Sequence, residues 1–387
     1  MNENTKFDKR CRVTNYLNLF ISFLYWGSIL FTLHQLYLGS KLLLVGGRDP
    51  EECKSNLPLE VLYIFERSNR ITSTHRKLLL PLSHNHEYVA YHAFVGSNDK
   101  THFVLVGNSL FKFDASNFRW MHVPLIKGRC QMCNEGLSAR CFRCNRRGAS
   151  GSLIAHDTLL VAGGTGPNAN ICDIVELGRI ANKSLVKDFR QPYSSDYNDR
   201  SIKSPCWIRC PTHLPLWIED HTLLNIQNSK VILIGGYSAG LQESNRTFLG
   251  VLAKSHRDVL WTELASMEQP RAGHVSFKIG DFVYVAGGVR GTKRLVSCER
   301  YDVRRNIWET LKQVLPYPIR HASAVVDSKG KYCFISGGLK SQNLGPNRTS
   351  VKWKTSSNLI VYHINDGFKL YNDAFYANRE KHISILI

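Results

Sequence analysis

The sequence has few acidic residues beside its basic ones, and this shortage sets the character of its surface. Its 387 residues include 31 aspartates and glutamates against 50 lysines and arginines, which gives a formal net charge of +19. A basic balance favours acidic partners, whether an acidic peptide, a nucleic acid or an anionic membrane. The basic residues are spread along the chain instead of forming blocks. This spread argues against a dedicated nucleic-acid stripe.

The sequence also lacks a clear apolar run long enough to span a membrane. Residues 1–33 are basic and then apolar, but polar residues interrupt the apolar run at 17–33. This run is shorter than the span of about 20 residues that a bilayer requires, and no small-residue cleavage site follows it. We expect this N-terminal segment to be either an anchor or a displaced strand. A membrane-anchored or secreted protein, through residues 14–33, stays open as the alternative to a cytoplasmic one.

No regular disulfide framework is visible among the eleven cysteines. This favours a reducing compartment and therefore the cytoplasm. Cys298 and Cys333 lie in apolar runs, where a cysteine usually acts as a small buried hydrophobe. Cys206 and Cys210 have no second pair nearby, so we expect packing or a loop disulfide. Three glycosylation sequons favour the secreted alternative, although such short motifs often arise by chance. They begin at Asn182, Asn245 and Asn347.

Two Cys-x2-Cys pairs stand in a loop at about 125–150, separated by seven residues. The cysteines are Cys130, Cys133, Cys141 and Cys144. Their four thiolates are a ligand set typical of a tetrahedral zinc. Such a zinc would be structural, because four thiolates leave no open position for chemistry. The spacer is shorter than in common paired motifs, so an inserted loop with incidental cysteines or a disulfide remains the competing interpretation.

Motifs of catalysis are missing as well. The sequence shows no His-x-x-x-His pair on a helix, no nucleophile elbow and no phosphate loop, and Gly163-Gly-Thr-Gly166 does not lead into a helix. We therefore predict a non-catalytic protein that requires no cofactor. A metal-dependent enzyme is the alternative hypothesis.

The chain does contain a repeat, in which a short apolar run precedes a pair of glycines. The period is 50 residues between Gly287-Gly288 and Gly337-Gly338. Copies recur along the chain, with first glycines at Gly46, Gly107, Gly163, Gly235, Gly287 and Gly337. Gly107 is followed by Asn108 and is a weakened copy. Repeats of this length indicate an array of equivalent units.

Each unit reads as part of a β-sheet. Four or five successive apolar residues predict an inner strand buried on both faces. The glycines after it supply a turn with positive φ and allow close approach of backbones. Tyr301-Asp302 is followed by Trp308, and Phe113-Asp114 by Trp120 at the same spacing. We expect these aromatic residues to fill the space between adjacent sheets, which must pack around an axis to cover both faces.

An apolar strand, Gly-Gly, and then Tyr-Asp and Trp at fixed offsets resemble a kelch repeat. The resemblance covers residues 34–387 and implies an all-β, six-bladed kelch-type β-propeller of four-stranded blades. It is nearest to the propeller part of kelch-like proteins that also carry BTB and BACK domains, for which we see no room before residue 34. Some kelch propellers are copper oxidases, but we can assign none of the required Tyr and His ligands.

The resemblance also implies a partner-binding face. Arginines precede the opening strand of several units and would converge there: Arg147, Arg271, Arg320 and Arg379. Their planar guanidinium groups suit bidentate binding of carboxylates, so we expect a partner with an acidic segment. Solvent-facing loop arginines are the competing interpretation. As in other kelch proteins, the partner would belong to a cullin-type ubiquitin ligase, for which this chain would be a substrate receptor, or to the actin cytoskeleton.

The two ends of the chain compete for one position in the first unit. Residues 378–387 resemble the opening strand at 271–277, so the C-terminal strand could complete the first sheet and remove a free edge. Residues 34–38 are a second candidate for the same position. We expect the histidines that recur with the repeat to be structural; they are His274, His321 and His382.

Overall fold

In the computed structural model, the described part of the chain is built from β-strands and contains no helix. The structure describes residues 41–45, 48–49, 54–55, 60–64, 71–75, 94–98, 101–106, 109–114, 119–123, 148–155, 158–165, 170–179, 207–240, 242–342, 352–375 and 383–386.

Six antiparallel sheets of four strands make up most of this part of the chain. The first three are β34 (Ile383–Leu386), β1 (Lys41–Val45), β4 (Glu60–Ile64) and β5 (Ile71–His75); β6 (Phe94–Asn98), β7 (Thr101–Val106), β8 (Ser109–Asp114) and β9 (Arg119–Val123); and β10 (Ser150–Ala155), β11 (Thr158–Ala162), β12 (Val175–Arg179) and β13 (Trp207–Arg209). The last three are β15 (Thr222–Gln227), β16 (Lys230–Ile234), β19 (Thr247–Leu252) and β20 (Val259–Leu264); β21 (Val275–Ile279), β22 (Phe282–Ala286), β25 (Cys298–Asp302) and β26 (Ile307–Thr310); and β28 (Ser323–Val326), β29 (Tyr332–Ser336), β32 (Leu359–His363) and β33 (Gly367–Tyr371).

Smaller sheets and hairpins lie in the loops. They are β14 (Ile218–Glu219) with β17 (Tyr237–Ser238) and β18 (Gln242–Glu243); β27 (Ile319–Arg320) with β30 (Leu339–Gln342) and β31 (Lys352–Thr355); β2 (Arg48–Asp49) with β3 (Lys54–Ser55); and β23 (Val289–Arg290) with β24 (Lys293–Arg294).

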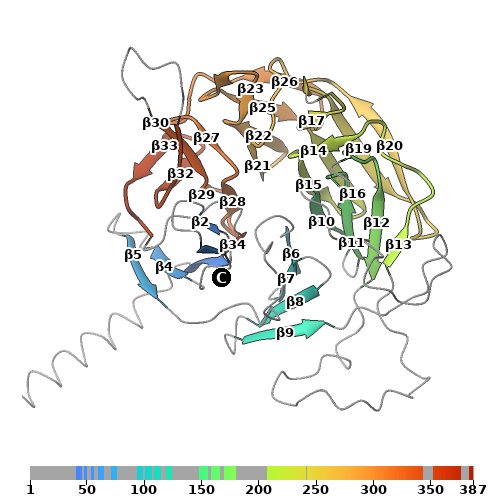
Figure 1. The fold of residues 1–387 in the computed structure, drawn as a ribbon, viewed down its shortest axis with the longest axis horizontal. Helices are drawn as coiled ribbons and strands as arrows, with labels where there is room; N and C mark the ends of the chain where they lie inside the picture. The colour runs from blue at the N-terminus through green and yellow to red at the C-terminus, as the bar shows by residue number, and fades with distance from the viewer. Residues whose placement is uncertain are drawn as a thin grey trace, which may run out of the picture.

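The first strands of the large sheets lie innermost and beside one another. In chain order β6 contacts β10, β10 contacts β15, β15 contacts β21 and β21 contacts β28; β28 and β6 both contact β34. Figure 1 shows the sheets arranged about this centre with their last strands outward. The predicted all-β class, with antiparallel four-stranded sheets, is confirmed.

The predicted apolar runs form the second strand of each large sheet. In β11 every residue is buried, and in β16, β22 and β29 all but the first are buried. In the last four sheets the glycines that follow have positive φ, for example 70° at Gly287 and 85° at Gly288. A Cβ atom on Gly287 would lie 2.6 Å from the carbonyl oxygen of Ile319. The glycine therefore serves both predicted purposes, a left-handed turn and a close backbone approach.

The predicted aromatic filling is also present. The rings of Tyr301 and Trp308 lie 5.1 Å apart, and those of Phe113 and Trp120 lie 4.8 Å apart. Trp308 donates a 2.9 Å hydrogen bond to the carbonyl oxygen of Ala265, which belongs to the loop after the fourth sheet. It packs in one cluster with residues of both β16 and β22. This indole therefore joins the fourth sheet to the fifth.

The C-terminal strand completes the first sheet. β34 pairs antiparallel with β1, in a register that places Leu42 opposite Leu386 and Val45 opposite Ile383. The position that the sequence left open between two candidates is thus taken by β34. Residues 34–38, the other candidate, lie outside the described residues.

The N-terminal segment and the Cys-rich loop are outside the described part as well. Among the residues that the structure describes, no helix is long and apolar enough to cross a membrane. The apolar run at 17–33 and the four cysteines of the predicted zinc site are not among these residues. Both expectations therefore stay predictions.

Candidate interaction face

Two kinds of loop meet at one end of each sheet. Because the strands are antiparallel, the loop after the second strand and the loop into the next first strand leave the same end. We call this end of the last three sheets the loop face. It comprises residues 218–221, 235–240, 242–246, 271–274, 287–297, 311–322 and 337–342. The small sheets β14-β17-β18 and β27-β30-β31 and the hairpin β23-β24 order these loops.

Arg271 does not present its side chain on the loop face. Its guanidinium is fully buried and donates to Glu299 at 2.5 Å, to the carbonyl oxygen of Gly287 at 2.9 Å and to that of Ser297 at 3.1 Å. The Glu299 carboxylate also accepts the backbone N–H of Glu268 at 2.7 Å. The expectation that Arg271 binds a partner is thus corrected, because the pair clamps the loop before β21 to strand β25.

Arg320 occupies a different position from Arg271. Gly273 donates its N–H to the carbonyl oxygen of Asp220, and His321 donates its N–H to that of Gly273, both at 2.9 Å. These three residues also share positive φ values of 63°, 49° and 55°. His321 is therefore the counterpart of Gly273, which makes Arg320 the counterpart of Ala272 and not of Arg271.

His274 and His321 are consequently not repeats of one position, although each has an internal partner. His274 is buried and its Nε2 lies 3.0 Å from the hydroxyl of Thr222. Burial, with the nearby positive charge of Arg271, lowers the pKa of His274 to about 3. His321 Nε2 lies 3.0 Å from the carboxylate of Asp220. These contacts fit the structural role expected for both histidines, but in two separate positions.

Polar groups of both signs gather where the fourth and sixth sheets meet the loop face. Tyr237 lies among them: burial and the negative charge of Glu243 raise its pKa, and the positive charge of Arg320 lowers it. Glu243 itself accepts the backbone N–H of Gly291 at 2.8 Å. The half-buried Arg320 therefore lies near Tyr237, which also has the acidic groups of the fourth sheet around it.

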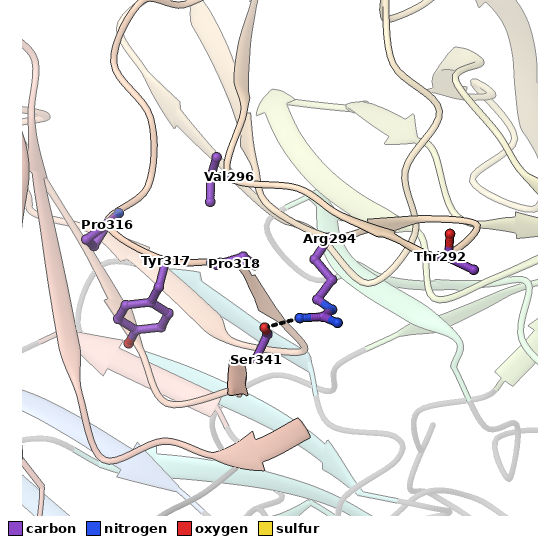
Figure 2. Close-up of a pocket in the computed structure, with 7 residues that line it drawn as sticks. All are labelled: Thr292, Arg294, Val296, Pro316, Tyr317, Pro318 and Ser341. Carbon is purple, nitrogen blue, oxygen red and sulfur yellow. Dashed lines mark hydrogen bonds between the residues drawn. The ribbon is translucent and has the colours of Figure 1, made fainter. Parts of the chain in front are cut away.

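A pocket of about 450 Å³ opens on the loop face at the seam between the fifth and sixth sheets. Three segments line it: the hairpin β23-β24 and the chain after it, the loop before β27, and β30 (Figure 2). The lining residues are Thr292, Arg294, Val296, Pro316, Tyr317, Pro318 and Ser341. Arg294 donates a 2.5 Å hydrogen bond to the hydroxyl of Ser341.

Neither Arg294 nor Tyr317 was among the predicted site residues. Two sequence signals point to them after the fact: the basic turn 290–294 directly after a diglycine, and the Pro-Tyr-Pro run at 316–318. Burial raises the pKa of Tyr317, against weaker lowering by hydrogen bonds to Ser356 and Asn358. Its phenol therefore stays protonated and available as a hydrogen-bond donor at neutral pH.

The described cysteines are free thiols. Cys210 and Cys298 are buried, and burial raises the pKa of each to about 12. Cys333 is buried too, and its pKa is raised for the same reason. Cys298 and Cys333 thus behave as the predicted small hydrophobes, and Cys210 packs in a core cluster. Within the described ranges, no group of three or more potential metal ligands comes together.

Two further predicted site residues, Arg147 and Arg379, lie outside the described residues. Their predicted contact with a partner stays a prediction, as does the zinc site at Cys130, Cys133, Cys141 and Cys144.

Four-stranded antiparallel sheets with an apolar second strand, mostly followed by a diglycine, are the features that this chain shares with kelch repeats. A model of the kelch motif matches residues 270–313. Kelch-like protein 41b of Danio rerio is 30% identical over 146 residues, which are 36% of this chain and 23% of the relative. Kelch-like protein 7 of Mus musculus is 28% identical over 125 residues, 31% of this chain and 21% of the relative. Alpha-scruin of Limulus polyphemus is 31% identical over 120 residues, 29% and 12% of the two chains.

The chain thus contains a kelch motif and is similar to kelch-repeat proteins. The matches span less than a quarter of the length of these three relatives.

Proposed function

We propose that the chain is a non-catalytic protein-interaction module that binds an acidic segment of a partner on the loop face. Its six large sheets would be the blades of a closed six-bladed propeller. A rigid ring of this kind suits binding, because it holds loops from different blades in fixed positions.

The observation that carries the proposal is the pocket at the seam of the fifth and sixth sheets, with an arginine in its wall. Of its seven lining residues, Arg294 is charged and none is acidic. Exposed or half-exposed basic residues continue from it over the loop face: Arg290, Lys293, Arg320 and Lys340. Such a positive surface attracts an acidic segment and raises its association rate. Because Arg271 is buried, the exposed basic groups on the loop face come from the hairpins, and Arg320 is half-buried beside them.

The partner would belong to a ubiquitin-ligase pathway, with this chain as a cytoplasmic substrate receptor for a cullin-type ligase, or to the cytoskeleton, with this chain as an actin-associated scaffold. The resemblance to kelch-like proteins supports both settings. The acidic segment is common to the two.

A selection of random twelve-residue peptides displayed on phage tests the proposal with the full chain as bait. We expect enrichment of Asp and Glu over Asn and Gln, and weaker binding of the selected peptides to an Arg320→Ala variant. Arg304→Ala is the matched control: Arg304 is 78% exposed and pairs with Asp281 at the opposite end of the fifth sheet. Selected peptides without acidic enrichment, or equal losses in both variants, would contradict the proposal.

A further inference from the structure

We propose that the end of the last three sheets opposite the loop face binds the surface of an anionic lipid bilayer. We call this end the hairpin face. It comprises the turns between first and second strands and between third and fourth strands, at residues 228–229, 253–258, 280–281, 303–306, 327–331 and 364–366. In antiparallel sheets these turns leave the same end, and the three sheets lie beside one another. The inference goes beyond the proposed function, because it concerns another surface and another kind of partner.

The exposed charges of the hairpin face are mostly basic. Its exposed lysines and arginines outnumber its exposed aspartates; they are Lys254, Arg257, Arg304, Arg305, Lys329 and Lys331, against Asp281 and Asp366. Both of these aspartates already lie beside a group of the same sheet. Asp281 is 2.7 Å from Arg304. Asp366 is 2.7 Å from the ring of His363. The surface that faces the solvent therefore keeps an excess of positive charge.

The other aspartates of these turns bond to groups of the chain itself. Asp327 is buried, and its carboxylate accepts the backbone N–H groups of Lys331 and Tyr332 at 2.7 and 2.8 Å. The Asp258 carboxylate accepts the backbone N–H of Thr212 at 3.1 Å and its hydroxyl at 2.7 Å. These bonds also fix the turns, so the basic side chains beside them project from an ordered backbone.

Basic side chains are available to a partner on each of the three sheets. Lys254 and Arg257 of the fourth sheet, Arg305 of the fifth and Lys331 of the sixth are exposed and form no ion pair with any residue that the structure describes. Every basic residue close to an anionic bilayer adds to the attraction, which falls off within a Debye length. Charges spread over three neighbouring sheets suit an extended anionic surface more than a single small anion.

Exposed aliphatic side chains lie beside these charges. Leu260 and Ile307 occupy the same place in the fourth and fifth sheets, directly before the tryptophan of the last strand. They are 55% and 41% exposed. Ile364, in the outer turn of the sixth sheet, is 40% exposed. Aliphatic side chains gain free energy when they leave water for the boundary of the acyl chains. Each of the three sheets thus presents an apolar residue close to basic ones.

This combination favours a lipid surface over a nucleic acid. Basic groups alone would suit either polyanion. Proteins that bind single-stranded nucleic acids commonly add aromatic side chains that stack on the bases. The turns of the hairpin face contain no tryptophan, tyrosine or phenylalanine. Leucine and isoleucine provide no such stacking surface, whereas they can enter the outer part of a bilayer.

Co-sedimentation with vesicles tests this contact on the full chain. Vesicles of phosphatidylcholine alone are compared with vesicles in which about one third of the lipid is phosphatidylserine. We expect stronger binding to the vesicles that contain phosphatidylserine. This binding should weaken as salt is added, because the added ions screen the charges.

Two charge reversals separate the hairpin face from the net charge of the chain. Arg257→Glu combined with Arg305→Glu should weaken binding to the anionic vesicles at least about twentyfold, since each basic residue near the surface contributes about fivefold. The matched variant Arg290→Glu combined with Lys293→Glu changes exposed residues of the loop face by the same total charge. It should weaken binding less than about twofold, because these charges lie at the far end and are screened.

A second pair of variants tests the aliphatic residues. Leu260→Ser combined with Ile307→Ser should weaken binding about fivefold and leave its salt dependence unchanged. Val314→Ser is the control, because Val314 is 49% exposed on the loop face. Thermal unfolding of every variant checks that the sheets stay intact. An unchanged affinity of the double serine variant would overturn the part assigned to Leu260 and Ile307.

Three outcomes would overturn the inference as a whole. Equal binding to both kinds of vesicle, unchanged by the reversal of Arg257 and Arg305, would place the contact outside the hairpin face. Equal losses from the two charge reversals would show that net charge alone drives binding. Tighter binding of a single-stranded RNA, lost on the same reversal, would replace the bilayer by a nucleic acid. Each of these leaves the proposed function standing, because peptide selection on the loop face is measured separately.

Discussion

The loops that lead into β21 and β28 carry similar residues and use them differently. In the first loop Arg271 is enclosed and holds Glu299; in the second, Arg320 is half-buried and lies near Tyr237 on the loop face. The difference is one position: Arg271 is the counterpart of Ile319, whose carbonyl oxygen makes the same contact with a diglycine. The position of an arginine relative to the strand that follows, and not the similarity of the local sequence, decides whether its side chain is buried or exposed.

The variant with the largest expected effect on stability removes the buried arginine. We expect Arg271→Met to lower the free energy of unfolding by about 3–5 kcal/mol, because it leaves the Glu299 carboxylate buried without its ion pair. Chemical denaturation measures this loss. The matched variant Arg320→Met should cost less than about 1 kcal/mol.

A double variant separates the ion pair from the packing of the arginine stem. Arg271→Met combined with Glu299→Gln should be more stable than Arg271→Met alone, since no charge is then left buried. If Arg271→Met and Arg320→Met cost the same, the two arginines have equivalent roles and the comparison fails.

A second test addresses Gly287-Gly288, the diglycine that the loop before β28 contacts through the carbonyl oxygen of Ile319. Gly287→Ala should lower the free energy of unfolding by about 3 kcal/mol. The alanine would have to adopt a positive φ, and its Cβ would lie 2.6 Å from the carbonyl oxygen of Ile319. Gly291→Ala is the control: its φ is 54° and a Cβ there meets nothing within 4 Å, so only about 1 kcal/mol is expected. Denaturation curves of both variants give the difference, and equal costs would show that the close approach is not needed.

A third and smaller effect is a dependence on pH through His274. Its pKa in the folded chain is about 3, below the ordinary value of 6.5, because of burial and the charge of Arg271. Below pH 6.5 the unfolded chain binds a proton that the folded chain does not, so stability falls as pH falls towards 3. The expected contribution is about 1.4 kcal/mol per pH unit.

Denaturation at pH 7, 6 and 5 measures this slope in the wild type and in His274→Gln, which can still bond to Thr222. The variant should lose less stability between pH 6 and pH 5 than the wild type does. Equal slopes would show that His274 accepts a proton without unfolding.

The strands and their glycines could be predicted because their causes are local. Burial of a second strand such as β22 needs a run of apolar residues, and the turn after it needs Gly287 and Gly288, so both leave a mark in the sequence. The pair of Tyr301 and Trp308 is visible for the same reason, since a hairpin brings the two rings together at fixed spacing.

The candidate site could not be predicted in the same way. The role of Arg271 depends on Glu299, and the counterpart of His321 is set by a backbone bond to another sheet. The pocket unites Arg294 with Ser341, which is 47 positions further along the chain. None of these three relations has a period or a local pattern, so each becomes visible only once the sheets are packed.

The pairing of β1 with β34 also constrains the order of folding. β1 meets its inner neighbour only when the last described strand is in place, since Leu42 lies opposite Leu386. Contacts between such distant residues form slowly, and until then one edge of β1 stays open to other chains. During synthesis the first sheet to emerge is thus the last to be completed, and loss of only the last few residues would leave an unprotected edge at the start of the array.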